Sequence, residues 1–248
     1  MELASRKVLM GNQIKWIAIF AMLIDHIAWS FVPTYSALGQ VMHIIGRITA
    51  PTMCFFIAEG YAHTRNVKKY VLRLGIFALI SQLPFTFFET GKIQFISFQK
   101  PGETFSVIYT LLLSLLAVWA WDAIQNKVLK LFAILGLCIL ATPGDWSSMD
   151  VIFTLIFWIY RTDFKKQAAF FLIFIVTAFG FSILSMIIQG IPAYKELFQF
   201  GVLLCLPILS LYNGERGGSS YSKWAFYIFY PSHLLILGLI GLWIKNWR

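Results

Sequence analysis

The chain has 248 residues, of which 59% are apolar, 17% are aromatic and only 12% are charged, whereas soluble domains carry roughly 25% charged residues. This composition excludes a water-soluble globule, and a mean hydropathy of +0.75 leaves room for about nine membrane-spanning helices of about 20 residues each. The net charge of +9 arises between apolar runs, so the expected partners are membrane lipid headgroups or an anionic cofactor, and no nucleic acid.

Apolar stretches follow one another along the chain, divided by polar residues and by helix-breaking glycines and prolines. The stretches cover about 14–32, 41–62, 70–88, 104–121, 128–142, 149–160, 167–188, 196–212 and 223–244. We expect an all-α fold, a polytopic membrane helix bundle with about nine transmembrane helices, built as a single domain over residues 1–248. The first stretch lacks a small-residue cleavage motif and should remain as a span. The sixth is short for a full crossing.

Lys and Arg residues set the expected orientation, because basic loops are retained in the cytoplasm. With the N-terminus inside, most of the 20 Lys and Arg residues lie on the inner side. The outer exceptions are Arg47, Lys92, Lys100, Lys195, Lys245 and Arg248. The bias predicts a cytoplasmic N-terminus and an extracytoplasmic C-terminus, although the basic C-terminal tail argues mildly against the second.

Ionisable residues inside a span cost several kcal/mol unless they face protein or water, so each is a functional candidate. Asp25, His26 and Arg47 lie at a common depth, roughly 10 Å below the outer boundary. Gln82 and His233 also lie in the outer half of their stretches. Neighbouring helical residues point about 100° apart, so Asp25 and His26 cannot pair closely. We expect Arg47 to be the counter-ion of Asp25, which leaves His26 to accept a proton. The alternative is a structural ion pair beside a packing histidine.

A proline marks the last stretch, where His233 follows Tyr230 and Pro231. A proline inside a helix frees a backbone carbonyl and kinks the axis, and such a kink suits a pocket wall. The alternative is a histidine that is hydrogen-bonded to a neighbouring backbone carbonyl.

A second polar group lies at the expected cytoplasmic ends of stretches 41–62 and 70–88. It consists of Glu59, Tyr61, Arg65, Lys68, Lys69 and Arg73. Cations beside a helix start can hold phosphates through charge and exposed backbone N–H groups, although topology alone also requires a positive cytoplasmic loop. Glu59 needs a cation so near the membrane, and we expect Arg73, at matching depth, to provide it.

The remaining signals are weaker. The loop 145–150 contains the acidic residues Asp145 and Asp150, which either attract an amine-bearing acceptor or are simply solvated. No GxSxG, Walker, HExxH or cysteine-cluster motif is present, which argues against several hydrolase, nucleotide-motor and metal-site readings. The three cysteines lie inside apolar stretches and read as core residues.

Several short strings carry a resemblance to a known family. They are IKWIA at 14–18, MLIDH at 22–26, GRITAP at 46–51, EGY at 59–61, TRN at 64–66, YVLRL at 70–74, SQLPF at 81–85, LYNG at 211–214 and FYIFYPSHL at 226–234. Together they span almost the whole chain, and it resembles the TraX family, named after the membrane protein that N-acetylates the conjugative pilin subunit. That family is similar to a wider group of transmembrane acyltransferases, which includes polysaccharide O-acetylases and the lysosomal heparan-glucosaminide N-acetyltransferase.

The resemblance implies an acetyl-CoA-dependent membrane acyltransferase without a metal, in the bacterial cytoplasmic membrane. It makes His26 the catalytic base, with Asp25 and Arg47 in support. It assigns the acyl-CoA phosphates to Arg73 and the 65–69 cluster, with Glu59 and Tyr61 beside them. The acceptor side would use His233, Gln82, Tyr230 and Asp145. The chain departs from the family at 104–110 (TFSVIYT), where members often have an Asn-Val-Leu-Phe-Thr-like start, and this departure concerns the acceptor pocket.

Two other classes compete with the enzyme. Intramembrane Asp, His and Arg residues also build relays in small ion- or proton-coupled transporters, although an odd span count and the absence of inverted repeats argue against one. A non-catalytic assembly protein would have no need of His26 and His233. The acceptor remains open among a peptide amine, a glycan, a lipid headgroup and a small amine, as does the choice between direct transfer and an acyl-histidine intermediate.

Overall fold

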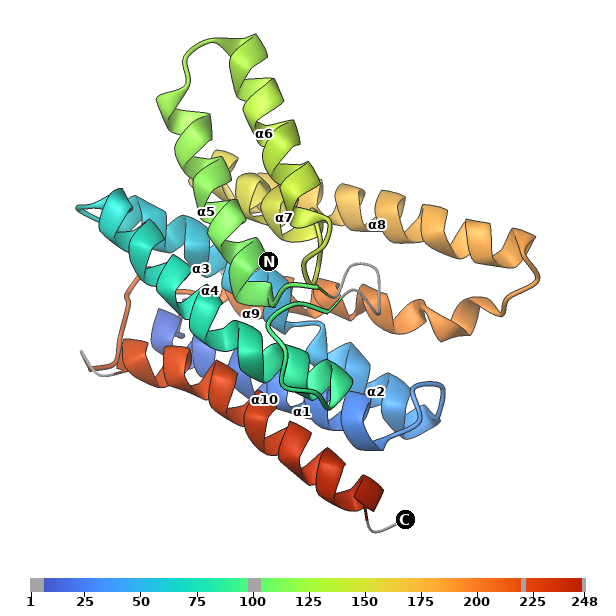
Figure 1. Cartoon of the computed structure of the whole chain (residues 1–248). Coiled ribbons are helices and arrows are strands. Elements are labelled where there is room, and N and C mark those ends of the chain that lie inside the picture. Colours follow the sequence, from blue (N-terminus) through green and yellow to red (C-terminus); the bar gives the residue numbers. More distant parts are fainter. Residues whose placement is uncertain (1–6, 98–103, 220–221, 247–248) are drawn as a thin grey trace. The chain divides into compact units, whose positions relative to one another are not determined.

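The computed structural model describes residues 7–97, 104–219 and 222–246, and within them the regular elements are helices (Figure 1). The α-helices are α1 (Gly11–Phe31), α2 (Ala37–Gly46), α3 (Thr49–His63), α4 (Val67–Thr90), α5 (Val107–Ala123), α6 (Lys127–Ala141), α7 (Met149–Ile159), α8 (Phe164–Ile188), α9 (Cys205–Ser210) and α10 (Ser222–Asn246). Two 3₁₀ segments, η1 (Ala193–Lys195) and η2 (Leu197–Leu204), precede α9. The all-α expectation is confirmed for these residues.

Five helical stretches in the described residues are long and apolar enough to cross a membrane. They are Gly11–Phe31, Ala37–His63, Val67–Thr90, Phe164–Ile188 and Trp224–Ile244. Val107–Ala123, Met149–Ile159 and Leu197–Ser210 are shorter apolar helices. The chain is therefore a helical membrane protein; the expected number of about nine crossings stays a prediction.

Two of the predicted stretches are not continuous α-helices. The stretch 41–62 is divided at Arg47 and Ile48, where α2 ends and α3 begins. Pro51 has no N–H to donate and fits only in the first turn of a helix, so it favours a new start close to Thr49. The stretch 196–212 begins as the 3₁₀ segment η2 and becomes α-helical only in the short α9.

The helices group into two compact units, which we describe separately. Unit 1 comprises Met1–Met53 with Tyr160–Ser222, and unit 2 comprises Cys54–Ile159 with Lys223–Arg248. The expectation of a single domain stays a prediction.

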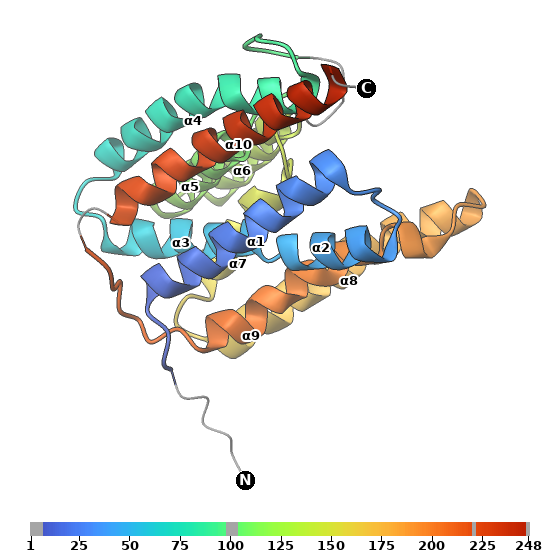
Figure 2. The ribbon, with the colours of Figure 1, turned by 90° about the horizontal axis from the view of Figure 1, so that it is seen from below.

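In unit 1, α2 packs against both α1 and η2. Figure 2 shows α1 and α2 side by side. Two glycines permit close approach. A Cβ on Gly46 would lie 2.2 Å from Cβ of Asp25 in α1. A Cβ on Gly201 in η2 would lie 2.3 Å from the carbonyl oxygen of Ile44 in α2. The absence of side chains at these points lets α1, α2 and η2 bring their polar residues together.

The start of α1 is tied to the segment that follows α9. Leu9 N–H donates to the Leu211 carbonyl at 2.9 Å and its own carbonyl accepts from Asn213 N–H at 3.0 Å. Gly11 N–H donates to the Glu215 carbonyl at 2.8 Å. The Gly11 bond satisfies a donor that the helix start leaves without an intrahelical partner, and the three bonds together anchor the start of α1 in unit 1.

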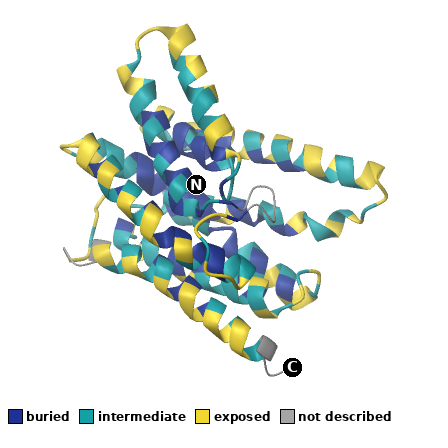
Figure 3. Cartoon of the chain, viewed as in Figure 1, coloured by how far each residue is buried: buried dark blue, intermediate teal, exposed yellow. Residues whose placement is uncertain are grey.

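In unit 2, α5 packs against α4, α6 and α7, and α10 lies beside α4 in both Figure 1 and Figure 2. Buried residues concentrate where α5 meets α7, while exposed residues follow α10 (Figure 3). Large apolar side chains are exposed on the outer faces, for example Phe132 in α6 and Ile228 in α10. In a membrane protein such faces contact lipid, and the fold therefore keeps its polar groups on the inner helix faces.

Candidate functional site

Asp25 is the centre of a buried polar arrangement in unit 1, which we call the Asp25 cluster: Asp25 and Trp29 from α1, His43 and Arg47 from α2, and Phe198 from η2. The Nδ1 of His43 lies 2.7 Å from Oδ1 of Asp25. An Arg47 guanidinium nitrogen lies 3.5 Å from Oδ2 of the same carboxylate. The Asp25–Arg47 pair expected from their common depth is thus present, with a histidine as second partner of the carboxylate.

Two aromatic rings enclose these charged groups. The His43 ring centroid lies 4.2 Å from that of Trp29 and 5.2 Å from that of Phe198. The Arg47 guanidinium carbon lies 5.8 Å and 5.1 Å from the same two ring centroids, within cation–π range. Asp25, His43 and Arg47 are all buried, and His43 is 0% exposed. In such a low-dielectric setting the hydrogen bonds are stronger than in water, and loss of one partner costs more.

His26 follows Asp25 on α1 and is half-buried. Its carbonyl accepts a hydrogen bond from Ser30 at 2.9 Å. The two neighbours therefore differ in setting: Asp25 faces α2, while His26 lies on an adjoining face of α1.

His43 is the residue of this cluster that the sequence analysis missed. It lies close to the outer end of the predicted stretch 41–62, where a polar residue reads as a boundary. The signal that finds it is the spacing of His43 and Arg47, four residues apart, which puts both side chains on the same helix face toward Asp25.

Both the nitrogen and the oxygen of the Gln82 side-chain amide in α4 form hydrogen bonds with the backbone of the connection between α4 and α5. Its Nε2 donates to the carbonyls of Phe95 at 3.1 Å and Thr104 at 2.7 Å, and its Oε1 accepts from Ser106 N–H at 3.1 Å. Gln82 is 3% exposed. This geometry makes Gln82 an anchor of the loop that leads into α5.

His233 and Tyr230 in α10 are also buried. The Nδ1–H of His233 donates to the Phe229 carbonyl at 2.9 Å, and its ring stacks on Phe229 with centroids 4.8 Å apart. The Tyr230 ring meets His233 edge-on at 5.7 Å. A histidine bonded to a neighbouring carbonyl was the alternative that the sequence left open, and the structure has this bond.

The expected pairing of Glu59 with Arg73 is wrong. Arg73 lies over the rings of Tyr70 at 5.1 Å and Tyr227 at 5.8 Å, and its Nε–H donates to the Tyr227 hydroxyl at 3.3 Å. A carboxylate of Glu59 lies 3.9 Å from Nδ1 of His63. Aromatic faces can accommodate a guanidinium at a membrane boundary without an acid, which is why depth alone misled the prediction.

The other members of the second polar group lie around the start of α4. Arg65, Lys68 and Lys69 are exposed. The Asn66 side chain caps α4 by accepting from Lys69 N–H at 2.9 Å. Tyr61 in α3 packs edge-on against Trp158 with ring centroids 4.8 Å apart. The exposed cations at a helix start are a suitable surface for phosphate groups.

Asp150 is not a solvated loop acid. It lies in the first turn of α7 and is 0% exposed. Thr110 donates its hydroxyl to Oδ2 at 2.7 Å, and the Cys54 thiol donates to Oδ1 at 3.4 Å. Asp145 donates its backbone N–H to the Phe105 carbonyl at 2.8 Å. The sequence misplaced Asp150 because the residues before it are polar, while its donors come from distant helices.

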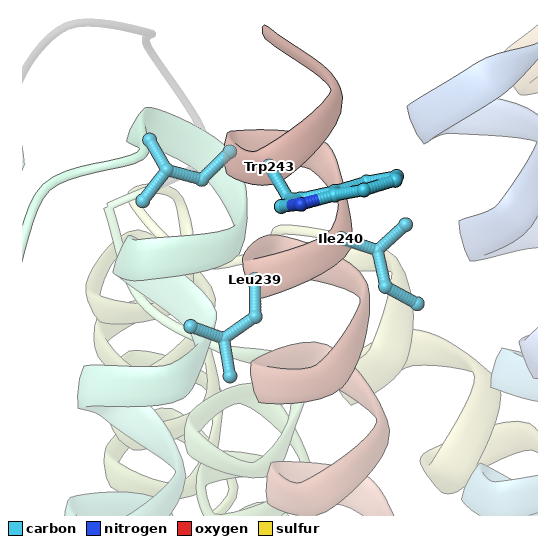
Figure 4. Close-up of a pocket in the computed structure, with 4 residues that line it drawn as sticks. Leu239, Ile240 and Trp243 are labelled. Carbon is cyan, nitrogen blue, oxygen red and sulfur yellow. The ribbon is translucent and has the colours of Figure 1, made fainter. Parts of the chain in front are cut away.

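An open depression of about 460 Å³ lies on α10, lined by Leu239, Ile240, Leu242 and Trp243 (Figure 4). Its lining is apolar, and the four residues are exposed. It offers hydrocarbon contact and no group that carries out chemistry, so the Asp25 cluster remains the stronger candidate site.

Comparison with known proteins identifies the family. The family model described as TraX protein matches residues 10–241. The chain is also similar to the probable fimbrial assembly protein FimC, serogroup H1, of Dichelobacter nodosus, with 33% identity over 234 residues, 91% of this chain and 93% of the relative. No solved structure matches. The motifs, the apolar helices and these matches agree that the chain belongs to the TraX family of membrane proteins.

Proposed function

We propose that this protein is an integral-membrane acyltransferase of the bacterial cytoplasmic membrane. It transfers an acetyl or other acyl group from cytoplasmic acyl-CoA to an amine or hydroxyl acceptor at or across the membrane. The observation that carries the proposal is the Asp25 cluster. Burying a carboxylate with His43 and Arg47 between two membrane helices costs free energy, and ionisable residues in such positions usually serve a function.

In this reaction His26 is the general base. It takes the proton from the acceptor N–H or O–H as the acceptor atom bonds to the acyl carbon. The bond from that carbon to sulfur then breaks, and the departing thiolate takes the proton from the imidazolium, which gives the free CoA thiol and restores neutral His26. The ionised Asp25 stabilises the imidazolium that His26 becomes, and Arg47 holds Asp25 in place. Acetyl-CoA supplies the acyl group as a thioester.

The donor side rests on the cations at the start of α4. Arg65, Lys68 and Lys69 are exposed and lie next to backbone N–H groups of a helix start, which fits the phosphates of an acyl-CoA. Arg73 is held by Tyr70 and Tyr227, and it adds positive charge one turn further along.

The name of the relative bears on the identity of the acceptor. The Dichelobacter nodosus protein is named as a probable fimbrial assembly protein. This name supports an acceptor amine on a fimbrial or pilin-like peptide; a glycan, a lipid headgroup or a small amine would be outcomes that correct it.

The test is transfer of label from radiolabelled acetyl-CoA by the purified protein in liposomes that contain candidate acceptors. We expect label to move to a peptide amine with the wild-type protein and not with His26→Ala. Gln125→Ala is the control, since Gln125 is exposed and lies outside both the Asp25 cluster and the cations at the start of α4. Transfer at the wild-type rate by a folded His26→Ala protein would remove His26 as the base.

Absence of binding and transfer with several acyl-CoA donors would favour the competing class, a small ion- or proton-coupled transporter. The buried Asp25, His43 and Arg47 would then form a relay. Proton uptake into liposomes in response to an ion gradient would identify that activity.

A further inference from the structure

We propose that His43 is a positioning residue for acyl transfer, which fixes the Asp25 carboxylate, the charge that in the proposed function stabilises the His26 imidazolium. The inference rests on the proposed function and adds a residue that the sequence motifs do not include. The two carboxylate oxygens of Asp25 have different partners: Oδ1 lies 2.7 Å from His43 and Oδ2 lies 3.5 Å from Arg47. With each oxygen held by a different partner, the carboxylate cannot rotate freely.

The hydrogen bond also fixes the tautomer of His43. An ionised carboxylate only accepts, so the proton of a neutral His43 must be on Nδ1. Its Nε2 then carries a lone pair, and this atom is buried without a hydrogen-bond partner. An unsatisfied buried polar atom costs free energy, and the bond from Nδ1 to the buried Asp25 carboxylate offsets this cost, because removing a partner from a buried carboxylate is itself destabilising. A structural role and a role in the reaction both follow from this bond, and the substitutions below separate them.

The surroundings hold the ring in one orientation. Trp29 and Phe198 lie 4.2 Å and 5.2 Å from the His43 ring, and Gly46 allows α2 to approach Asp25 closely enough for the 2.7 Å bond. His43 is 0% exposed, so it acts on the reaction through Asp25 rather than by touching an acceptor. His43 thus orients Asp25, as supporting residues around a reactive site orient the residues that act on the substrate.

Three substitutions separate this role from others. In His43→Asn the amide nitrogen lies near the position of Nδ1 and can still donate to Asp25. In His43→Gln the amide lies nearer the position of Nε2, and in His43→Leu no donor remains. Each protein is first checked for folding by thermal unfolding in detergent and for acyl-CoA binding.

We expect His43→Leu and His43→Gln to lower kcat by up to about 100-fold, the cost of misplacing a reacting group by about 1 Å. KM for acyl-CoA should stay unchanged, and His43→Asn should recover most of the rate. The pH profile of kcat should move in the Leu and Gln variants and stay near that of the wild type in the Asn variant. Should His43→Leu fail to fold, the Asn and Gln variants still give the comparison.

Equal loss in folded Asn, Gln and Leu variants would overturn the proposal, because the ring itself would then react. Unchanged rates in all of them would overturn it as well, leaving a packing role. A readout independent of turnover is the ¹⁵N spectrum of His43 in lipid, which should show a proton on Nδ1; a proton on Nε2 alone would contradict the geometry. A wild-type protein without transfer activity overturns the proposed function itself, and this outcome is seen before any variant is made.

Discussion

At the residue scale, Gly46 is the position where one extra carbon has the largest expected effect on the Asp25 cluster. An alanine Cβ would lie 2.2 Å from Cβ and 2.6 Å from Oδ1 of Asp25, so α1 and α2 would have to separate. We expect Gly46→Ala to destabilise the protein by about 1–3 kcal/mol, the usual cost of overpacking. Thermal unfolding in detergent measures it. Gly136→Ala is the control, because nothing lies within 4 Å of a Cβ there; equal melting of the two variants would contradict the close approach.

Gln82 gives a second prediction at this scale, one that separates an anchor from a ligand-binding residue. Gln82→Leu leaves Ser106 N–H and two carbonyls without their partner, so we expect a loss of roughly 1–3 kcal/mol and faster amide exchange at Ser106. Hydrogen exchange read by mass spectrometry measures this. Gln125→Leu is the matched control, since Gln125 is exposed and donates to the Asp122 carbonyl at 3.2 Å, away from the loop that Gln82 contacts. Unchanged exchange at Ser106 would show that the loop does not depend on Gln82.

The sequence predicted a pair correctly where two oppositely charged residues on consecutive helices lie at a similar expected depth in the membrane. Asp25 and Arg47 lie on consecutive helices at the same depth, and they pair. Depth failed for Glu59 and Arg73, because Arg73 uses aromatic rings that hydropathy does not distinguish from core residues. Asp150 could not be placed from the sequence, because its donors come from helices that are distant along the chain.

At the element scale, apolar runs predicted helix positions well and helix continuity less well. The stretch 167–188 corresponds to α8, which begins earlier, at Phe164, and the stretch 70–88 corresponds to α4, which is longer at both ends. Polar residues in the terminal turns belong to the helix but not to the apolar run. The break between α2 and α3 lies beside Gly46 and Arg47, both close to Asp25, and just before Pro51, and an apolar run does not show such tertiary contacts. The 3₁₀ segment η2 has the same apolar composition as an α-helix, so composition could not reveal it.

The cap of α8 supplies a pH-dependent prediction at this scale. Asp163, at the end of the preceding loop, accepts from Lys166 N–H at 3.1 Å, and this bond, followed by the Lys166 side chain, lowers the pKa of the carboxyl. A lowered folded-state pKa means that the stabilisation is present above the unfolded value of about 3.9 and is lost as pH falls through the folded value. We expect protection of the Lys166 amide to fall in acid and to stay constant in Asp163→Asn, which keeps the cap without the charge.

Hydrogen exchange between pH 7 and pH 3, corrected for intrinsic rates, tests this expectation. The cap of α6 is an internal control in the same sample, because Asn126 does not titrate and accepts from Leu129 N–H at 3.0 Å. A loss of protection at the Lys166 amide that persists in Asp163→Asn, or an equal loss at the Leu129 amide, would mean that general unfolding in acid is responsible.

At the scale of the whole molecule, the orientation of the chain decides whether the proposed donor side can meet acyl-CoA. The helix α4 has 24 residues, about 36 Å at the α-helical rise, which exceeds a hydrocarbon core of about 30 Å. A crossing by α4 would place its two ends on opposite sides of the membrane. Lys68 near its start and Lys92 beyond its end are both exposed, and the distribution of basic residues predicts the first in the cytoplasm and the second outside.

Single cysteines at these positions test the orientation. With a membrane-impermeant maleimide we expect Lys92→Cys to be labelled in intact spheroplasts and Lys68→Cys only after the membrane is opened. The parent protein gives the background; Cys54 and Cys205 are buried, and Cys138→Ala removes the half-buried third thiol. The opposite pattern would put Arg65, Lys68 and Lys69 outside, away from cytoplasmic acyl-CoA. The proposed donor site would then be wrong even if the Asp25 cluster proved essential, since a phosphate-bearing donor cannot reach a surface on the other side of the membrane.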